Sequence, residues 1–286
     1  MKVLTVQDIA CYGKCSTTLA LPVLSSLGLE TSLLPTALLS THTGFNDPFI
    51  LDLTDSMEKI LDHFTALGLS FDCIQIGYLT GPKQLSIVEK VLDTWPEAKV
   101  VLDPAMGDDG RLYPAVDRDT AAAFRHLAQR ADLVLPNLTE AFALADLPYQ
   151  TDISLEVLME KIPCRGTRVI TGLKGKYGSN DRRIAAAWQD ESLYQTEEGV
   201  RVGLYQTEEM AGHYHGTGDL FAAVMTACLL YHVPASKAVP IACEFTLDCV
   251  RRTMLEEPAD RQGNHWNGLH FEKELPSLIN RMRPYL

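Results

Sequence analysis

The stretch that decides the fold of this chain is HYHGTGDLFAA, which runs from His213 to Ala223. Two glycines bracket Thr217, and Asp219 follows them at the start of an apolar run that predicts a helix over Leu220–Tyr231. Backbone N–H groups at a helix start bind anions without basic side chains, and glycines let a ligand approach the backbone closely. An aspartate in the first turn also stabilises a helix by itself. The stretch therefore predicts either an anion cradle with a catalytic carboxylate or a well-capped turn.

Strand-like and helix-like runs alternate along the rest of the chain. The expected strands are Val3–Val6, Thr31–Leu39, Cys73–Ile76, Lys99–Leu102, Leu133–Leu135 and Arg168–Ile170. The expected helices are Ser16–Leu27, Asp55–Leu67, Pro82–Thr94, Asp119–Arg130, Thr139–Ala145, Leu155–Ile162, Leu220–Tyr231, Ala235–Leu255 and Phe271–Met282. Such alternation predicts an α/β fold, with a mostly parallel central sheet flanked by helices on both faces. We expect one domain over residues 1–286.

The alternation breaks between residues 183 and 208. Three short runs there predict a short antiparallel edge of the sheet: Ile184–Gln189, Ser192–Gln195 and Val200–Gln206.

Composition excludes several classes of partner. The chain has 25 Lys and Arg against 37 Asp and Glu, a net charge of −12, so neither nucleic acid nor an anionic membrane is expected to bind. An anionic substrate then needs a helix N-terminus or a metal ion to supply positive charge. Seven scattered cysteines predict reduced thiols, and neither a signal peptide nor a membrane span of ~20 apolar residues is present, which favours the cytoplasm.

Polar clusters follow four of the expected strands, where ligands bind in open α/β sheets. The clusters are Gln7-Asp8 with Tyr12-Gly13, Ser40–Gly44, Asp103–Gly110 and Pro136–Glu140. Each also has a purely structural interpretation. Asn137 and Glu140 can form a capping box, His42 can be a satisfied loop residue, and Asp103-Pro104 can start a turn.

Common phosphate and catalytic motifs are missing. Gly175-Lys176 and Gly13-Lys14 lack the Ser or Thr that a Walker loop requires, and Phe221 replaces the last glycine of a dinucleotide fingerprint. The failed glycine pattern therefore disfavours a Rossmann dehydrogenase.

Taken together, these motifs resemble the ribokinase-like superfamily and, within it, the vitamin B6 (pyridoxal/pyridoxamine) kinases. The similar pieces occur in family order along nearly the whole chain: Val6-Gln7, Tyr12-Gly13, Ser40–Gly44, Gly77–Leu79, Asp103–Asp108, Pro136–Glu140, Val169–Thr171 and Gly216–Ala223. The resemblance implies an ATP-dependent kinase of the 5′-hydroxymethyl group of pyridoxal, pyridoxamine or pyridoxine, in pyridoxal phosphate salvage. It also implies a homodimer that uses Mg²⁺ with ATP, and it leaves a monovalent cation open.

The same resemblance assigns roles to residues. Asp219 is the base that accepts the hydroxyl proton, and Gly216, Thr217 and Gly218 form the anion hole for the transferred phosphoryl group. Asp103 and Glu140 place Mg²⁺ and the phosphates. The remaining ATP-binding residues are Asp108, Asn137, Thr171 and Gly172, the substrate-binding residues are Asp8, His42, Thr43 and Tyr78, and the loop Asp108–Tyr113 lies over the site.

Three positions depart from the B6 kinase pattern. Asp8 replaces the usual serine, the usual asparagine is missing from Lys14–Thr17, and Leu135 replaces a polar residue. A carboxylate at position 8 can pair with a pyridine N–H⁺ or an amine, so these departures leave the preferred vitamer open.

Two other functions remain as hypotheses. A hydroxymethylpyrimidine kinase of thiamine synthesis usually starts with a glycine-rich motif that Asp8–Cys15 lacks, and the sugar and nucleoside kinases are disfavoured on similar grounds. The second hypothesis is a non-catalytic B6 binder, against which the intact Asp219, Gly216 and Gly218 argue.

Overall fold

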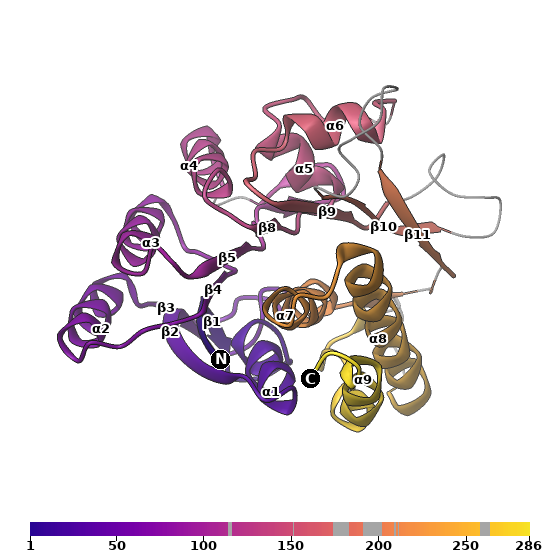
Figure 1. The fold of residues 1–286 in the computed structure, drawn as a ribbon, viewed down its shortest axis with the longest axis horizontal. Helices are drawn as coiled ribbons and strands as arrows, with labels where there is room; N and C mark the ends of the chain where they lie inside the picture. Colours follow the sequence, from indigo (N-terminus) through magenta and orange to yellow (C-terminus); the bar gives the residue numbers. More distant parts are fainter. Residues whose placement is uncertain are drawn as a thin grey trace.

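A nine-stranded sheet forms the centre of the computed structural model (Figure 1). The structure describes residues 1–113, 116–150, 152–173, 183–190, 202–208, 210, 212–257 and 264–286, with the backbone alone for 183–185 and 264. The strand order is β11-β10-β9-β8-β5-β4-β1-β2-β3. The strands are β1 (Lys2–Ala10), β2 (Glu30–Leu39), β3 (Ile50–Asp52), β4 (Cys73–Ile76), β5 (Lys99–Leu102), β8 (Leu133–Val134), β9 (Thr167–Thr171), β10 (Arg183–Gln189) and β11 (Gly203–Thr207). All pairs from β2 through β9 are parallel, as the alternation of elements predicts.

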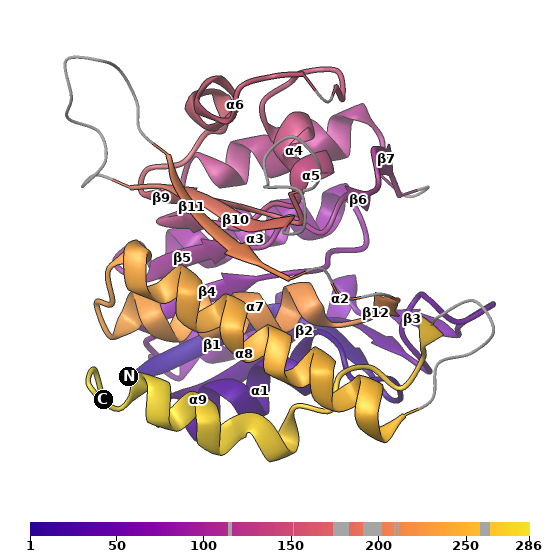
Figure 2. The same ribbon diagram turned by 90° about the vertical axis from the view of Figure 1, so that its right-hand side faces the viewer.

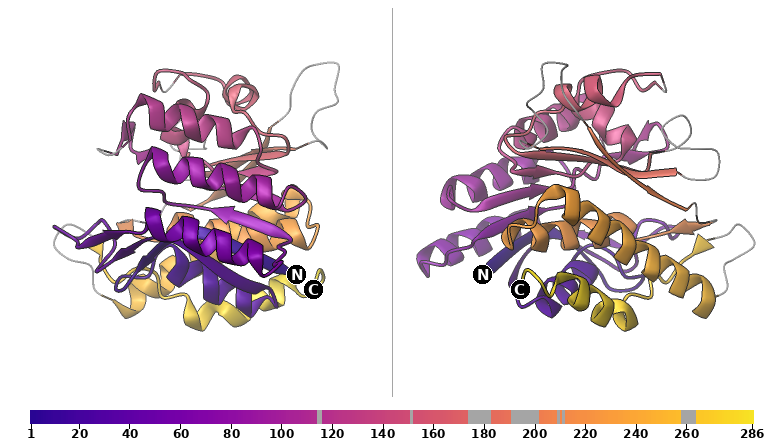
Figure 3. Two further views of the ribbon diagram at one scale, coloured as in Figure 1. Left: turned by 90° about the vertical axis from the view of Figure 1, so that its left-hand side faces the viewer. Right: turned by 45° about the vertical axis from the view of Figure 1, so that its right-hand side comes forward.

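Helices cover both faces of this sheet (Figures 2 and 3). One face carries α1 (Thr17–Ser26), α7 (Thr217–Leu230), α8 (Ala235–Glu256) and α9 (Leu275–Met282), which Figure 2 shows grouped on one side. The other face carries α2 (Thr54–Ala66), α3 (Pro82–Thr94), α4 (Arg118–Ala128), α5 (Leu138–Leu144) and α6 (Leu155–Lys161). The α/β architecture with helices on both faces is therefore confirmed.

Neighbouring residues of the short strands feed two separate hydrophobic cores. Cys73 and Val101 pack with α1, α7 and α8, whereas Ile74 and Leu102 pack with the helices of the opposite face. Side chains of a strand alternate between the two faces of a sheet, so a sheet buried on both faces needs continuous apolar strands.

Helix α7 lies at the centre of the first core. Ten of its 14 residues are buried, and it packs against α1 and α8. A helix that is buried on nearly all sides has no polar face, which explains the unbroken apolar run after Asp219.

The antiparallel edge near residues 183–208 is confirmed, because β10 pairs antiparallel with both β9 and β11. The expected run Ser192–Gln195 lies outside the described residues. The opposite edge ends in β3, a three-residue antiparallel strand that the sequence pattern did not predict because it is short and exposed.

Three other features differ in detail from the sequence prediction. Strand β1 continues past Val6 to Ala10, so Asp8 lies inside the strand, where the register with β2 shifts. The expected helix Phe271–Met282 is split into a 3₁₀ turn (η3, Glu272–Glu274) and α9, which has a proline in its first turn. Two small pairs were also not predicted: β6 (Gly107–Asp108) with β7 (Arg111–Leu112), and β12 (His213–Tyr214) with β13 (Asn264–His265).

All seven cysteines are free thiols, as expected from their spacing. Within the described ranges, no helix is long and apolar enough to cross a membrane.

Candidate active site

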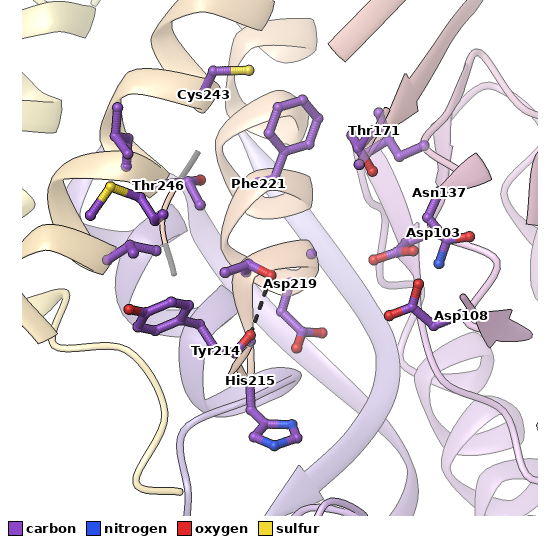
Figure 4. Close-up of a pocket in the computed structure, with 18 of the residues that line it drawn as sticks. Asp103, Asp108, Asn137, Thr171, Tyr214, His215, Asp219, Phe221, Cys243 and Thr246 are labelled. Carbon is purple, nitrogen blue, oxygen red and sulfur yellow. Dashed lines mark hydrogen bonds between the residues drawn. The ribbon is translucent and has the colours of Figure 1, made fainter. Parts of the chain in front are cut away.

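A cavity of about 560 Å³ opens at the carboxyl ends of β5, β8 and β9. Figure 4 shows Asp219 on α7 facing Asp103, Asp108 and Asn137 across it, with Thr246 of α8 on the far side of α7. The cavity brings together all ten residues that the sequence assigned to the anion hole, the base, the metal and ATP: Asp103, Asp108, Asn137, Glu140, Thr171, Gly172, Gly216, Thr217, Gly218 and Asp219.

The N-terminus of α7 has backbone N–H groups that no described side chain caps. Gly216 is the N-cap residue in a left-handed conformation (φ +87°), and a β-carbon there would lie 2.5 Å from Leu19 Cδ1 and 2.8 Å from Lys14 O. Only glycine fits these contacts. No described side chain caps the helix, so the first-turn N–H groups are available to an anion.

Gly218 has a different environment. Gly218 lines the cavity, and a β-carbon there would meet Asp103 Oδ2 at 3.9 Å, an ordinary van der Waals contact. Its lack of a side chain is therefore not required by packing.

Asp103 and Asp219 bring negative charge to opposite sides of this space. Burial raises the pKa of Asp219, and hydrogen bonds from Ser16 oppose that shift. Burial and the Asp219 carboxylate both raise the pKa of Asp103. Among the described residues, no Lys or Arg pairs with either carboxylate. The described residues therefore provide no counter-charge for these two carboxyl groups, and a bound proton or an added cation would supply it.

Asn137 and Glu140 form the capping box that the sequence allows. Asn137 Oδ1 accepts a hydrogen bond from Glu140 N (3.0 Å), and Glu140 Oε2 accepts one from Asn137 N (2.9 Å). Glu140 Oε1 accepts another from Met106 N (3.0 Å), and Asn137 Nδ2 donates to Gly107 O. Burial and the charge of Asp103 raise the pKa of Glu140. These bonds tie the loop after β5 to α5, so both residues also have a structural role.

Asp8 lies next to Asp219 beyond this cavity. Burial raises the pKa of Asp8 to about 6, and the Asp219 carboxylate adds to the shift, while a hydrogen bond from Ser16 opposes it. Asp8 Oδ1 is buried with no hydrogen-bond partner among the described residues. No sequence motif singles out Ser16, which forms hydrogen bonds that lower the pKa of both Asp8 and Asp219. Ser16 has a positive φ (49°), which is uncommon for serine.

His42 is buried, and both nitrogens of its ring form hydrogen bonds. Its Nδ1 accepts a hydrogen bond from Gly44 N (3.1 Å) and its Nε2 donates to Trp266 O (2.8 Å), which fixes the neutral tautomer. Burial lowers its pKa, in agreement with that tautomer. The ring stacks on His215, with 4.2 Å between centroids.

The four predicted substrate residues lie outside the cavity lining. Asp8 faces Asp219, and the Asp8 charge contributes to a raised pKa of Tyr78. His42 stacks on His215, which precedes the anion hole, whereas Thr43 is exposed. The structure therefore places Asp8 and His42 near the Gly216–Asp219 turn, outside the cavity lining.

The cavity also has a wall that the sequence did not reveal. Its residues are mostly apolar and come from α7, α8 and the loops before them: Met210, Tyr214, Phe221, Cys243, Thr246, Leu247 and Val250. Apolar helix residues give no chemical signal in a sequence, so only the tertiary packing identifies them.

Three comparisons with known proteins agree with this geometry. Residues 36–261 match the family model described as phosphomethylpyrimidine kinase. The chain is 27% identical to a pyridoxine/pyridoxal/pyridoxamine kinase of Bordetella bronchiseptica, over 88% of this chain and 89% of that one.

Two solved structures are similar over nearly their whole length. The pyridoxal kinase of Lactobacillus plantarum has a TM-score of 0.87 and 31% identity, over 98% of this chain and 96% of that one. A Bacteroides thetaiotaomicron protein assigned to the phosphomethylpyrimidine kinases, in a crystal form with pyridoxal, has a TM-score of 0.82 and 33% identity, over 97% and 95%.

Proposed function

The chain belongs to the phosphomethylpyrimidine kinase family, and we propose that it is an ATP-dependent kinase of a B6 vitamer, acting on the 5′-hydroxymethyl group. One observation supports this most directly. The uncapped N-terminus of α7 carries Asp219 in its first turn and faces Asp103 across the cavity. The similarity to pyridoxal kinases over nearly the whole chain favours a pyridine alcohol as the acceptor.

Asp219 is the proton acceptor in this proposal. A hydroxyl group is a weak nucleophile, and a carboxylate within hydrogen-bond reach accepts its proton as the oxygen attacks the phosphoryl group. The N–H groups of Thr217, Gly218 and Asp219 point from the helix start toward the charge that develops on the phosphoryl oxygens. The chain thus supplies positioning and charge stabilisation, which phosphoryl transfer chiefly requires.

Mg²⁺ fits the donor set of the cavity. The described residues contain no group of three or more His, Cys, Asp or Glu that could hold a metal by themselves. Mg²⁺ is usually held by one or two carboxylates with waters and phosphates, and the raised pKa of Asp103 indicates a carboxylate without a counter-charge. Asp103 would hold the ion, with Glu140 orienting the loop beside it. When bound, Mg²⁺ would neutralise phosphate charge.

We assign nucleotide binding to the part of the cavity near the end of β9 and α8. Thr171 ends β9 and Gly172 follows it, and Thr246 and Val250 of α8 also line the cavity. An apolar wall of this kind suits a flat base. Together with the sequence resemblance, it supports ATP as the phosphoryl donor.

An ATP-consumption assay with purified protein tests the proposal. Pyridoxal, pyridoxamine, pyridoxine and hydroxymethylpyrimidine are supplied separately with Mg²⁺, and the phosphorylated products are identified by mass. We expect turnover of at least one B6 vitamer at a kcat/KM above that for hydroxymethylpyrimidine. A preference for hydroxymethylpyrimidine would favour the thiamine-pathway alternative, and binding without turnover would favour a non-catalytic binder.

We further propose that residues 1–286 act as one kinase domain, because one sheet joins β11 to β3 without interruption. The homodimer, the cytoplasmic location and any use of a monovalent cation stay predictions from the sequence.

A further inference from the structure

The segment 264–268, here called the C-terminal strap, closes over three loops beside the α7 turn. Its first two residues form β13, which pairs in parallel with β12, just before the anion hole. Tyr12 donates a hydrogen bond to Asn267, and the Lys14 ammonium group bonds Leu269 O, immediately after the strap. The strap thus joins the loops that follow β1 and β2 to the turn that precedes α7.

Trp266 lies at the centre of these contacts. Its ring stacks on His215 at a centroid distance of 5.7 Å and an interplanar angle of 20°, and it packs on Phe45 at 5.3 Å. His42 closes the ring cluster, at 4.2 Å from His215 and 4.7 Å from Phe45. The Trp266 carbonyl accepts the hydrogen bond from His42 Nε2. Aromatic pairs in this distance range stabilise the arrangement beyond the burial of their surface.

Glycines around the cluster allow the rings and loops to approach one another closely. A β-carbon on Gly44 would lie 2.4 Å from His215 Cε1, and one on Gly13 would lie 2.4 Å from His42 Cδ2. Gly268 has a positive φ (76°), and its β-carbon would lie 2.7 Å from Lys14 O. These close approaches fix the relative positions of strap, loops and rings.

The contacts of Trp266 lie on the acceptor side of the site. His215 immediately precedes Gly216 and lines the cavity, and the loop of His42 carries the predicted substrate residue Thr43. The ring of Trp266 packs on His215 and Phe45, and both lie on this side of the site. A displacement of Trp266 should therefore disturb the acceptor alcohol more than the nucleotide.

We propose that Trp266 is a positioning residue for the acceptor. It holds the His42 and His215 loops, and through His215 the backbone at Gly216, in the arrangement that binds the alcohol for transfer. This role rests on the proposed kinase function.

Steady-state kinetics with both substrates varied, together with thermal unfolding, test the role. We expect Trp266→Ala to raise the acceptor KM about tenfold while the ATP KM changes less than about twofold, since misplaced loops weaken acceptor alignment. Trp266→Phe keeps an aromatic ring and should recover most of the loss. Gly268→Ala pushes the strap away from Lys14 O and should give the same acceptor-specific change.

Trp95→Ala is the matched control. Trp95 is buried, packs edge to face against Phe71 and donates a hydrogen bond to Leu69 O on the opposite face of the sheet, so its truncation should lower the Tm more than Trp266→Ala does. It should leave both KM values unchanged. Equal changes of the acceptor and ATP KM in Trp266→Ala, or no change in either, would overturn the role of Trp266.

The kinetic measurements on the wild type also test the proposed kinase function. If the wild type binds pyridoxine without turnover, the kinase proposal fails, and the ratio of pyridoxine Kd values between Trp266→Ala and wild type still tests the strap. A ratio near one would then reject the positioning role.

Discussion

Gly218 and Asp103 face each other across the cavity, with Asp103 Oδ2 only 3.9 Å from the position that a β-carbon on Gly218 would take. Apart from the backbone of α7 itself, no other described atom lies within 4 Å of that position. A methyl group there would be in ordinary van der Waals contact with Asp103, so packing does not require glycine at position 218.

Gly218→Ala should separate stability from catalysis. An alanine in the first turn of α7 fits without a clash and stabilises the helix by up to about 1 kcal/mol, so the Tm should stay equal or rise. The new methyl group would enter the space assigned to the phosphoryl group, so kcat/KM should fall about tenfold or more. Gly81→Ala, which also points into open space but lies outside the cavity, is the control. Full activity in Gly218→Ala would show that the phosphoryl group does not approach this backbone.

Asp219→Asn tests the proton acceptor. The amide cannot accept the hydroxyl proton, so kcat should fall ~10²–10⁴-fold. The ATP Kd, measured by calorimetry, should stay nearly unchanged, because Asp219 is not assigned to nucleotide binding. The exposed Asp62 provides Asp62→Asn as a charge-matched control without effect. Unchanged turnover in Asp219→Asn would remove the assigned role.

Asp103→Asn should change the Mg²⁺ requirement. Losing a carboxylate that has no protein counter-charge should raise the half-saturating Mg²⁺ concentration about tenfold. Glu140→Gln should raise it less and lower the Tm more, because the Glu140 oxygens already accept backbone hydrogen bonds. The reverse order would assign Glu140 as the principal metal ligand.

Asp8→Asn should stabilise the protein above neutral pH. The pKa of Asp8 is raised from 3.8 to about 6 in the folded protein, so the stability due to the neutral carboxyl is lost as the pH rises through about 6. A shift of roughly two pH units corresponds to about 3 kcal/mol. Urea unfolding should therefore show a gain for Asp8→Asn of up to about 3 kcal/mol at pH 7.5, and a much smaller gain at pH 4. A gain that does not depend on pH would contradict the assigned burial of the charge.

Asp8→Ser should change vitamer choice. The ionised Asp8 can pair with an amine or a pyridinium, so the pyridoxamine-to-pyridoxal ratio of kcat/KM should fall in the serine variant. In the wild type the same ratio should increase as the pH rises through about 6, where Asp8 ionises. Identical ratios in the two proteins at pH 7.5 would refute a role of Asp8 in vitamer choice.

The sequence predicted the parallel sheet because short, mostly apolar runs such as β4 and β5 alternate with amphipathic helices. It also predicted four of the carboxylates that line the cavity, those of Asp103, Asp108, Glu140 and Asp219. It did not reveal Ser16, whose role depends on a positive φ, or Trp266, which meets His42 across a sequence separation of 224 positions. Contacts between residues so far apart leave no local sequence pattern. The apolar cavity-lining residues of α8 have the same sequence pattern as ordinary core residues.

The deep burial of α7 has a consequence for hydrogen exchange. Ten of its residues are buried between α1 and α8, so its interior amides should exchange only through global unfolding. The anion hole at its N-terminus is then held at a fixed place before any ligand arrives, and little reorganisation energy is spent at the moment of transfer. Motion that closes the site should come instead from the opposite wall, where Asp108 and Tyr113 flank the short β6–β7 hairpin.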